Sequence, residues 1–168
     1  TTLAYAAVTR SGLSFPHQLW LRREIIPDLR RITDDIHAEG AAASIQVGHC
    51  GNMSHRSICG CMPLSASSGF NIYSPTLVRG MKRDEIVDMA REYGNSVRLA
   101  REAGFDAVEI HAGHGYLISQ FLSPYTNHRR DEYGGSLQNR MRFMRIVMDE
   151  VMEAAGDDMA ILVKVNTR

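Results

Sequence analysis

The sequence has 168 residues, of which 44% are hydrophobic and 23% charged, and its formal net charge is +0. These values are typical of a globular chain with a sizeable core, and the length fits a single domain. The balanced charge leaves no basic footprint for nucleic acid or a membrane surface. No apolar run approaches the roughly 20 residues that span a bilayer.

The cysteines give a weak indication of the compartment. There are three of them, Cys50, Cys59 and Cys61, an odd number gathered in one short segment. A secreted disulfide framework usually has an even number of spaced cysteines, so we expect a reducing, cytoplasmic setting. The chain opens at TTLAYAAV instead of a methionine, and we expect its natural N-terminus to lie further upstream.

Strand and helix patterns alternate along the chain. The opening run LAYAAV predicts a first strand, over residues 3–8. Three units then follow, each with helical spacing of apolar residues, a glycine that ends the helix, and a short apolar strand. The predicted helices cover residues 27–39, 86–103 and 137–155, the last capped by Ser136, and the predicted strands cover 41–47, 105–110 and 159–165.

This alternation predicts a parallel α/β sheet, either doubly wound or closed as a (β/α)8 TIM barrel. Gln46, His111 and Lys164 stand at or near the ends of successive strands, and polar groups gather at that end of a barrel. No glycine-rich GxGxxG turn follows a strand, which disfavours the doubly wound sheet. A full barrel needs about 250 residues. We therefore expect a partial barrel, one domain over residues 1–168 without a second domain, in which residues 49–81 form an irregular loop at the catalytic rim.

The stretch VEIHAGHGYLISQFLSP follows the third predicted strand and holds His111, His114 and Tyr116. Two imidazole N–H groups could stabilise negative charge on a carbonyl oxygen, and the phenol could donate a proton. The same side chains could instead cap loop carbonyls. A metal site is the third reading, with ligands from the rim loop. Cys59 and Cys61 are separated by only one residue, however, and structural zinc sites prefer two to four.

Two charged residues interrupt apolar strands. Lys164 lies in ILVKV and Glu109 in VEI, and a buried charge needs a partner. A Lys164–Glu109 pair and a cofactor contact by Lys164 are equally compatible with this pattern. Gln46 could bond a planar heterocycle or a neighbouring loop. The segment 127–140, with charges around the Gly134-Gly135 turn, is interpreted as a structural lock between loop and helix.

The run HAGHGYLISQFLSPYTNHRRDEYGGSLQNRMRF strongly resembles the signature of the old yellow enzyme family. IHAEGAAASIQVGHCG and AREAGFDAVEIH are similar to the preceding units of that family, so the resemblance covers most of residues 30–168. These flavin-dependent NADH:flavin oxidoreductases, or ene-reductases, are TIM barrels that carry FMN. The resemblance implies that the chain carries about strands two to five, and that the strands around it are missing.

The resemblance also implies roles for single residues. His111 and His114 match the pair that holds the substrate carbonyl, and Tyr116 matches the proton donor. Gln46 matches a residue that bonds the flavin pyrimidine edge. Lys164 falls where the family usually has an arginine near the flavin. A lysine keeps the positive charge but lacks the planar, two-pronged guanidinium group of arginine.

Two positions depart from the family pattern. His49-Cys50-Gly51-Asn52 replaces the usual His-x-Gly-Arg, so a common rim arginine is absent. Tyr5 stands where a small residue often lies, and no role is assigned to it.

The implied activity is hydride transfer from NAD(P)H through FMN to the activated C=C bond of an enone or enoate. We expect no metal, nucleic acid or membrane partner; the resemblance is compatible with a homo-oligomer, and with an iron–sulfur cluster and second flavin elsewhere in the parent. A metal-dependent barrel lyase or hydrolase and a non-catalytic Cys/His zinc segment remain the alternatives. We expect the isolated segment to be incomplete and not to hold FMN tightly by itself.

Overall fold

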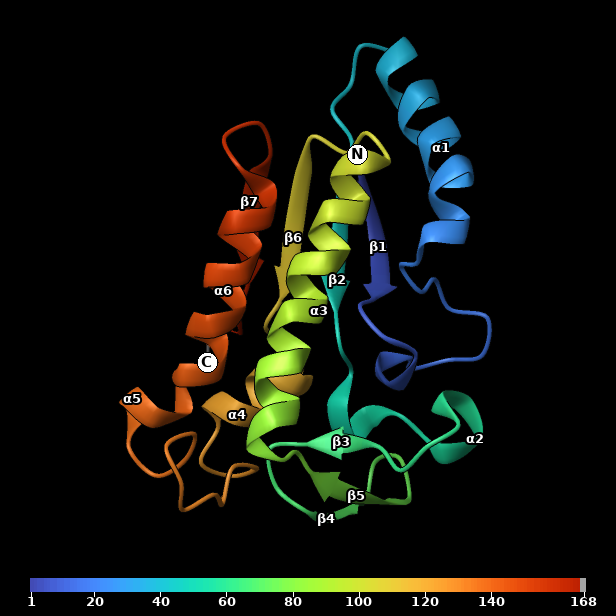
Figure 1. The fold of residues 1–168 in the computed structure, drawn as a ribbon. Coiled ribbons are helices and arrows are strands. Elements are labelled where there is room, and N and C mark those ends of the chain that lie inside the picture. The colour runs from blue at the N-terminus through green and yellow to red at the C-terminus, as the bar shows by residue number, and fades with distance from the viewer. Residues whose placement is uncertain (167–168) are drawn as a thin grey trace.

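The computed structural model describes residues 1–166 and contains a four-stranded parallel sheet (Figure 1). The strand order is β1-β2-β6-β7, and each adjacent pair is parallel. The four predicted strands are therefore confirmed, with boundaries shifted by up to three residues. Their bounds are Thr2–Ala7 for β1, Ser44–Gly48 for β2, Ala107–His111 for β6 and Ala160–Lys164 for β7.

Helices cover one face of this sheet. α3 (Arg83–Glu102) and α6 (Arg142–Ala155) lie side by side across it, and α1 (Ile26–Ala38) lies beside β1 (Figure 1). The strands bury alternate apolar residues in the same core as the helices, because successive strand residues point to opposite faces. Fully buried members of this core are Ile45, Val47, Val108 and Ile110 from the strands and Tyr93, Val97, Phe143 and Val147 from the helices.

The alternate strand residues point to the opposite face. Gln46 is in register with Glu109, and His111 is in register with Lys164. In a (β/α)8 barrel the face without helices is the interior. The last strand, β7, pairs only with β6 among the described strands, and its residues Leu162 and Val163 are 47% and 38% exposed. The sheet therefore has the layout of a barrel wall with an uncovered side.

The third predicted helix is divided in two. Ser136 caps a short helix α5 (Leu137–Arg140), and its side chain accepts a hydrogen bond from the Asn139 N–H. Helix α6 begins at Arg142, directly after Met141. The cap prediction is confirmed, but the expectation of one continuous helix is wrong because the chain makes a short turn before α6.

Residues 49–81 are more ordered than expected. This excursion contains the 3-10 turn η3 (Gly51–Met53), helix α2 (Arg56–Cys59) and a small sheet of order β3-β5-β4. Its strands are β3 (Leu64–Ser65), β4 (Gly69–Asn71) and β5 (Thr76–Gly80). A second unpredicted element, helix α4 (Leu117–Leu122), follows β6, and two 3-10 turns, η1 (Arg10–Gly12) and η2 (Arg23–Ile25), follow β1. We call residues 49–81 and 112–136 together the rim.

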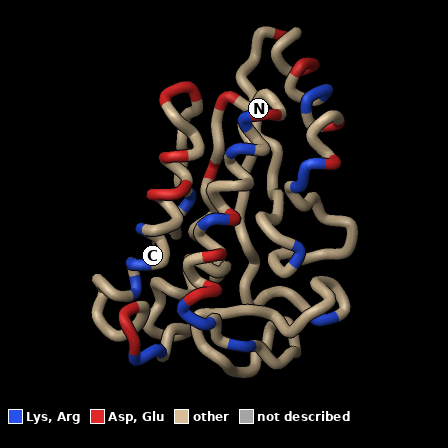
Figure 2. The backbone as a smooth tube through the Cα atoms, viewed as in Figure 1, with Lys and Arg blue, Asp and Glu red and all other residues tan. Residues whose placement is uncertain are grey.

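The distribution of charged residues follows the balanced net charge of the sequence. Both signs of charge occur on each of α1, α3 and α6 (Figure 2). Within residues 1–166, no helix combines the length and the apolar character that crossing a membrane requires.

Candidate functional site

Parallel pairing brings the strand ends together at one edge of the sheet. His111 is the last residue of β6, and Lys164, its partner in register, is the last residue of β7. Gly48 ends β2 on the other side of β6. The loop that carries His114 and Tyr116 starts at this edge, so the three residues predicted as catalytic lie in one region.

Their rings form a cluster around His111, which is only 3% exposed. The centroid of the His111 ring lies 4.9 Å from that of His114 and 4.8 Å from that of Tyr116. Both contacts are edge-to-face, at 66° and 82°. His114 is exposed and Tyr116 half-buried. The cluster thus has a buried centre and two members that reach solvent.

Neighbouring strands fix the turn that carries the cluster. The Ala112 N–H donates to the Lys164 carbonyl oxygen (2.8 Å), which ties the turn to β7. The Leu117 N–H donates to the His49 carbonyl oxygen (2.9 Å), which ties it to the end of β2. His114 adopts φ +54°, a conformation that is uncommon for residues other than glycine. Its N–H donates to Asn166 Oδ1 (3.0 Å), which helps to hold it there.

Burial keeps His111 neutral. It lowers the pKa of His111 to about 4, with the nearby charges of His114 and Lys164 acting in the same direction. At neutral pH the ring therefore carries one N–H and one bare nitrogen. Nδ1 of His111 is buried and has no hydrogen-bond partner among the described residues. A buried polar atom left without a partner is costly in a finished structure.

Tyr5 on β1 is a member of the cluster that sequence reasoning left without a role. Its ring lies 5.9 Å from that of His111 and 5.5 Å from that of Tyr116. Its hydroxyl donates to the Gly12 carbonyl oxygen (3.2 Å), and burial raises its pKa well above the usual value. A Cβ on Gly48 would lie 2.7 Å from the Tyr5 ring, so only glycine at this position lets the ring pack there.

Gln46 and Lys164 do not make the structural contacts that were considered as alternatives to cofactor binding. Gln46 lies mid-strand, 7% exposed, and its side-chain amide donates to the Glu109 carboxylate of the neighbouring strand, not to a loop. Lys164 is exposed and makes no ion pair with Glu109 within the part of the chain that the structure describes. Of the two alternatives left open for Lys164, the structure does not form the buried pair with Glu109, because β7 is the edge strand here and its end stays open to solvent.

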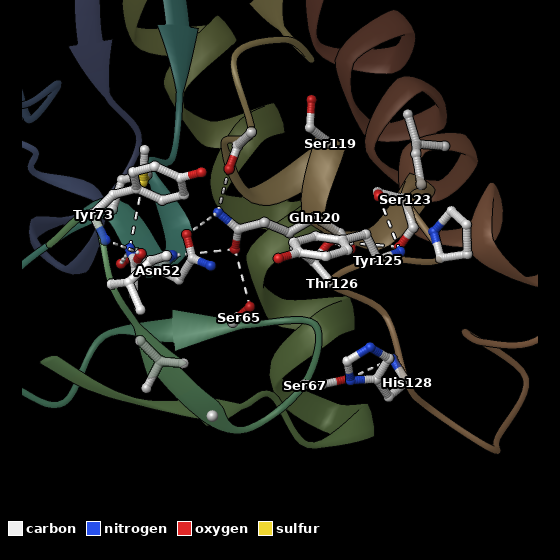
Figure 3. A pocket seen from close by; sticks show the side chains of 18 of the residues that line it. Asn52, Ser65, Ser67, Tyr73, Ser119, Gln120, Ser123, Tyr125, Thr126 and His128 are labelled. Carbon is white, nitrogen blue, oxygen red and sulfur yellow. Dashed lines mark hydrogen bonds between the residues drawn. The ribbon is translucent and has the colours of Figure 1, made fainter. Parts of the chain in front are cut away.

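Gln120 joins three rim segments, and its role was missed from the sequence (Figure 3). Its Oε1 accepts from the Asn52 N–H and the Ser65 hydroxyl, both at 3.1 Å. Its Nε2 donates to the Gly115 carbonyl oxygen (2.6 Å) and to Asn52 Oδ1 (2.8 Å). Gly51 passes so close that a Cβ there would overlap the Gln120 amide. One buried amide thus connects the loop after β6, at Gly115, to two segments of the excursion, at Asn52 and Ser65.

A hollow of about 970 Å³ opens beside Gln120. Its walls include Tyr73 from the excursion and Tyr125 from the segment after α4 (Figure 3). Ala112 and Gly115 also line it, but the cluster rings of His111, His114 and Tyr116 do not. The hollow therefore adjoins the cluster without containing it.

The charged segment 127–140 locks the rim, as its composition predicted. Arg129 forms a two-pronged pair with Asp131, with N–O distances of 3.0 and 2.6 Å. It also donates to the carbonyl oxygens of Ala66 (2.9 Å) and Met81 (2.6 Å) on the excursion. The structural interpretation is confirmed. The contacts of this segment extend beyond the predicted contact between loop and helix, because Arg129 also bonds the excursion.

The Cys/His residues of the excursion do not assemble as metal ligands. Within residues 1–166 there is no group of three or more His, Cys, Asp or Glu side chains placed to hold a metal ion. His49 is fully buried; its Nδ1 accepts from the Gly51 N–H (2.9 Å) and its Nε2 lies 3.0 Å from the Ser11 hydroxyl. Burial lowers the pKa of His49 to about 3. The buried Cys50 thiol donates to the Leu13 carbonyl oxygen (3.3 Å).

Comparison with known proteins shows which family this chain matches. The profile of the NADH:flavin oxidoreductase / NADH oxidase family matches residues 2–168. A 4,4'-dithiodibutanoate disulfide reductase of Rhodococcus erythropolis is 39% identical over 166 residues, which are 99% of this chain and 41% of that protein. An NADPH dehydrogenase of Bacillus subtilis (strain 168) is 39% identical over 130 residues, 77% of this chain and 38% of that protein.

The solved structure of morphinone reductase in complex with tetrahydroNAD superimposes with a TM-score of 0.92 at 26% identity. The match covers 98% of this chain and 50% of that chain. The chain thus spans about two fifths of the length of these curated relatives and half of this solved one. The predicted fold class, a partial barrel of α/β type, is confirmed.

Proposed function

This chain belongs to the NADH:flavin oxidoreductase / NADH oxidase family. We propose that it is part of an FMN-dependent enzyme that reduces an activated C=C bond. In this proposal NAD(P)H is the source of the hydride. The substrate is an α,β-unsaturated carbonyl compound, such as an enone or enoate. Residues 1–168 form part of its flavin-binding barrel domain. The observation that carries the proposal is the ring cluster of a buried, neutral His111 with His114 and Tyr116 at the strand ends.

Residues on the barrel-interior face fit a flavin ring in chemistry. The side-chain oxygen of Gln46 accepts no hydrogen bond from the described residues, so it is available to a donor on a planar heterocycle. Lys164 is an exposed cation at the same edge of the sheet and would offset negative charge on a bound ring. We propose these two residues as FMN contacts; FMN, when bound, would supply the hydride.

His111 and His114 would hold the substrate carbonyl oxygen. A neutral imidazole can donate one hydrogen bond, and two such donors stabilise the negative charge that develops on the oxygen as the alkene is reduced. The unpartnered Nδ1 of His111 is compatible with a ligand that completes its hydrogen bonding. The hydrogen bonds that Lys164, Asn166 and His49 accept from backbone N–H groups of the turn would hold the turn that carries both rings without substrate.

Tyr116 would complete the reduction by giving its hydroxyl proton to the α-carbon. The residue is the N-cap of helix α4, and its ring lies edge-on to both His111 and Tyr5. This packing limits the directions in which the hydroxyl can point. In this arrangement the histidines bind the carbonyl oxygen and the tyrosine acts on the neighbouring carbon.

Tyr116→Phe tests these roles in the full-length protein. We expect alkene reduction to slow by about 10²–10⁴-fold, the usual contribution of a positioned proton donor, while flavin reduction by NAD(P)H proceeds at the wild-type rate. Stopped-flow absorbance follows the two half-reactions separately. Tyr125→Phe is the matched control, because that tyrosine is 82% exposed and outside the cluster. Equal loss in both half-reactions would remove Tyr116 from the proposed role.

A further inference from the structure

The excursion contains a pair of thiols that the proposed hydride transfer does not use. Cys59 ends helix α2 in the excursion (Figure 1), which contacts η1, and Cys61 follows after Gly60. The two Sγ atoms lie 3.7 Å apart. Both cysteines are free; Cys59 is buried and Cys61 is exposed. One thiol is thus accessible to a small molecule and the second lies directly behind it.

The backbone between them allows closer approach. A disulfide requires an S–S distance of about 2.05 Å, so the sulfur atoms must move together. Gly60 adopts φ +77° and caps α2, and glycine tolerates the backbone changes that such closure needs. A bridge across a single residue is strained and therefore easily reduced again, so an excess of the small disulfide is needed to keep it closed.

Two arginine side chains lie near the thiol pair. Arg79 and Arg10 both favour the Cys61 thiolate, although burial and the neighbouring Cys59 have the larger effect and raise the pKa of Cys61. Arg79 is already paired with Glu85, at 2.7 and 2.8 Å. Arg10 makes no ion pair within residues 1–166, and its guanidinium lies 3.5 Å from a Cβ built on Gly60. An anionic ligand at Cys61 would therefore meet an uncompensated charge.

We propose that Cys59 and Cys61 form a dithiol–disulfide pair that exchanges with small organic disulfides carrying carboxylate groups. The Cys61 thiolate attacks one sulfur of R–S–S–R, forms a mixed disulfide and releases one R–S⁻. The Cys59 thiolate then attacks Cys61 Sγ, closes the intrachain bond and releases the second R–S⁻. The two cysteine protons end on two R–SH molecules, so the pair is oxidised by two electrons and the small disulfide is reduced.

Peptide mapping of the full-length protein tests this exchange. The protein is reduced, freed of reductant, treated with glutathione disulfide, alkylated after denaturation and digested with trypsin. Residues 57–79 contain both cysteines and no internal Lys or Arg, whereas Cys50 falls in a separate peptide. We expect peptide 57–79 to lose the mass of two hydrogens, to carry no glutathione and to resist alkylation. Cys50 should be alkylated.

Single variants separate the two steps. Cys59→Ser should retain one glutathione on Cys61, because the resolving thiol is gone. Cys61→Ser should leave the buried Cys59 unmodified over the same time. Wild-type peptide that keeps glutathione, or that is alkylated at both cysteines, would overturn the proposal. The wild-type map does not depend on the folding of any variant, and none of these outcomes bears on the roles proposed for His111, His114 and Tyr116.

Discussion

The sheet with its helices and the rim are stabilised in different ways. In the first region, α3 and α6 bury apolar side chains against β2 and β6, and the strands alternate between a helix face and an interior face. In the rim, single polar side chains connect distant segments, above all Gln120 and Arg129. Apolar packing is repetitive and distributed over many residues. The rim depends on a few buried or partly buried hydrogen bonds.

The two regions therefore contribute differently to the stability of the domain and to the geometry of the His111–His114–Tyr116 cluster. The sheet sets the direction and spacing of the strand ends, so it decides where His111 lies. The turn that carries His114 and Tyr116 belongs to the rim, and it is held by hydrogen bonds to Lys164 at the end of β7, to Asn166 and to His49 just after β2. A variant in the sheet region should therefore lower the stability of the whole domain, whereas a variant in the rim should also disturb the cluster locally.

Phe143→Ala should have the largest effect on stability. Phe143 is fully buried on α6, with its ring 4.5 Å from that of Phe121, and truncating such a residue costs about 3–5 kcal/mol of unfolding free energy. Urea unfolding of the full-length protein, followed by circular dichroism, measures the change. Met152→Ala on the same helix is the control, because Met152 is 51% exposed. Similar losses in both variants would contradict the packing described for α6.

Gln120→Leu should have a smaller effect on global stability and a clear local one. Leucine has a comparable volume but leaves the Asn52 N–H and the Ser65 hydroxyl without their acceptor, at a cost of about 2–3 kcal/mol. Hydrogen exchange should accelerate at the Asn52 amide more than in α3.

Gln138→Leu, an exposed glutamine on α5, serves as its control and should change stability by less than about 0.5 kcal/mol. Uniform acceleration of exchange in Gln120→Leu across sheet and rim would show that the two regions are not distinct.

His49 should make the free energy of unfolding of the protein depend on pH. Its pKa is about 3 in the folded protein and near 6.5 when unfolded, so the unfolded state binds more protons between those values. Stability is therefore complete above pH 6.5 and falls as the pH drops, by about 1–2 kcal/mol between pH 6.5 and 5.

Urea unfolding of wild type and His49→Asn at both pH values measures this term. Asparagine keeps an acceptor for the Gly51 N–H but does not titrate. The variant should lose less stability than wild type on acidification, even if it is weaker at pH 6.5. Equal losses in the two proteins would exclude His49 as the cause.

The sheet could be predicted from the sequence, because its helices are long enough to show a period and each is followed by a glycine and a short apolar strand. The patterns around Ile86–Ala100 and in MAILVKV predicted α3 and β7 at nearly their observed bounds. The end of β6 at His111 followed from the loss of apolar residues at that point. The cluster of His111, His114 and Tyr116 was also predicted, although its contribution to catalysis stays a proposal.

The rim could not be predicted in the same way. Its strands β3 and β4 have only two and three residues, too few for a period to appear. The hydrogen bonds of Gln120 to Asn52 and Ser65 join residues more than fifty positions apart. Gln120 did give a signal, as a lone amide in the otherwise largely apolar stretch LISQFL. The exposure of Lys164 had no signal in the sequence, because it depends on what lies beside β7.

The most direct test of the proposed function is the visible absorption of the full-length protein under anaerobic conditions. We predict a yellow protein without stoichiometric zinc, whose absorption is bleached by NADH or NADPH and recovers when 2-cyclohexenone is added, with one saturated ketone formed per flavin reoxidised. A colourless protein that contains zinc would contradict the account. So would a bleached flavin that the enone fails to reoxidise.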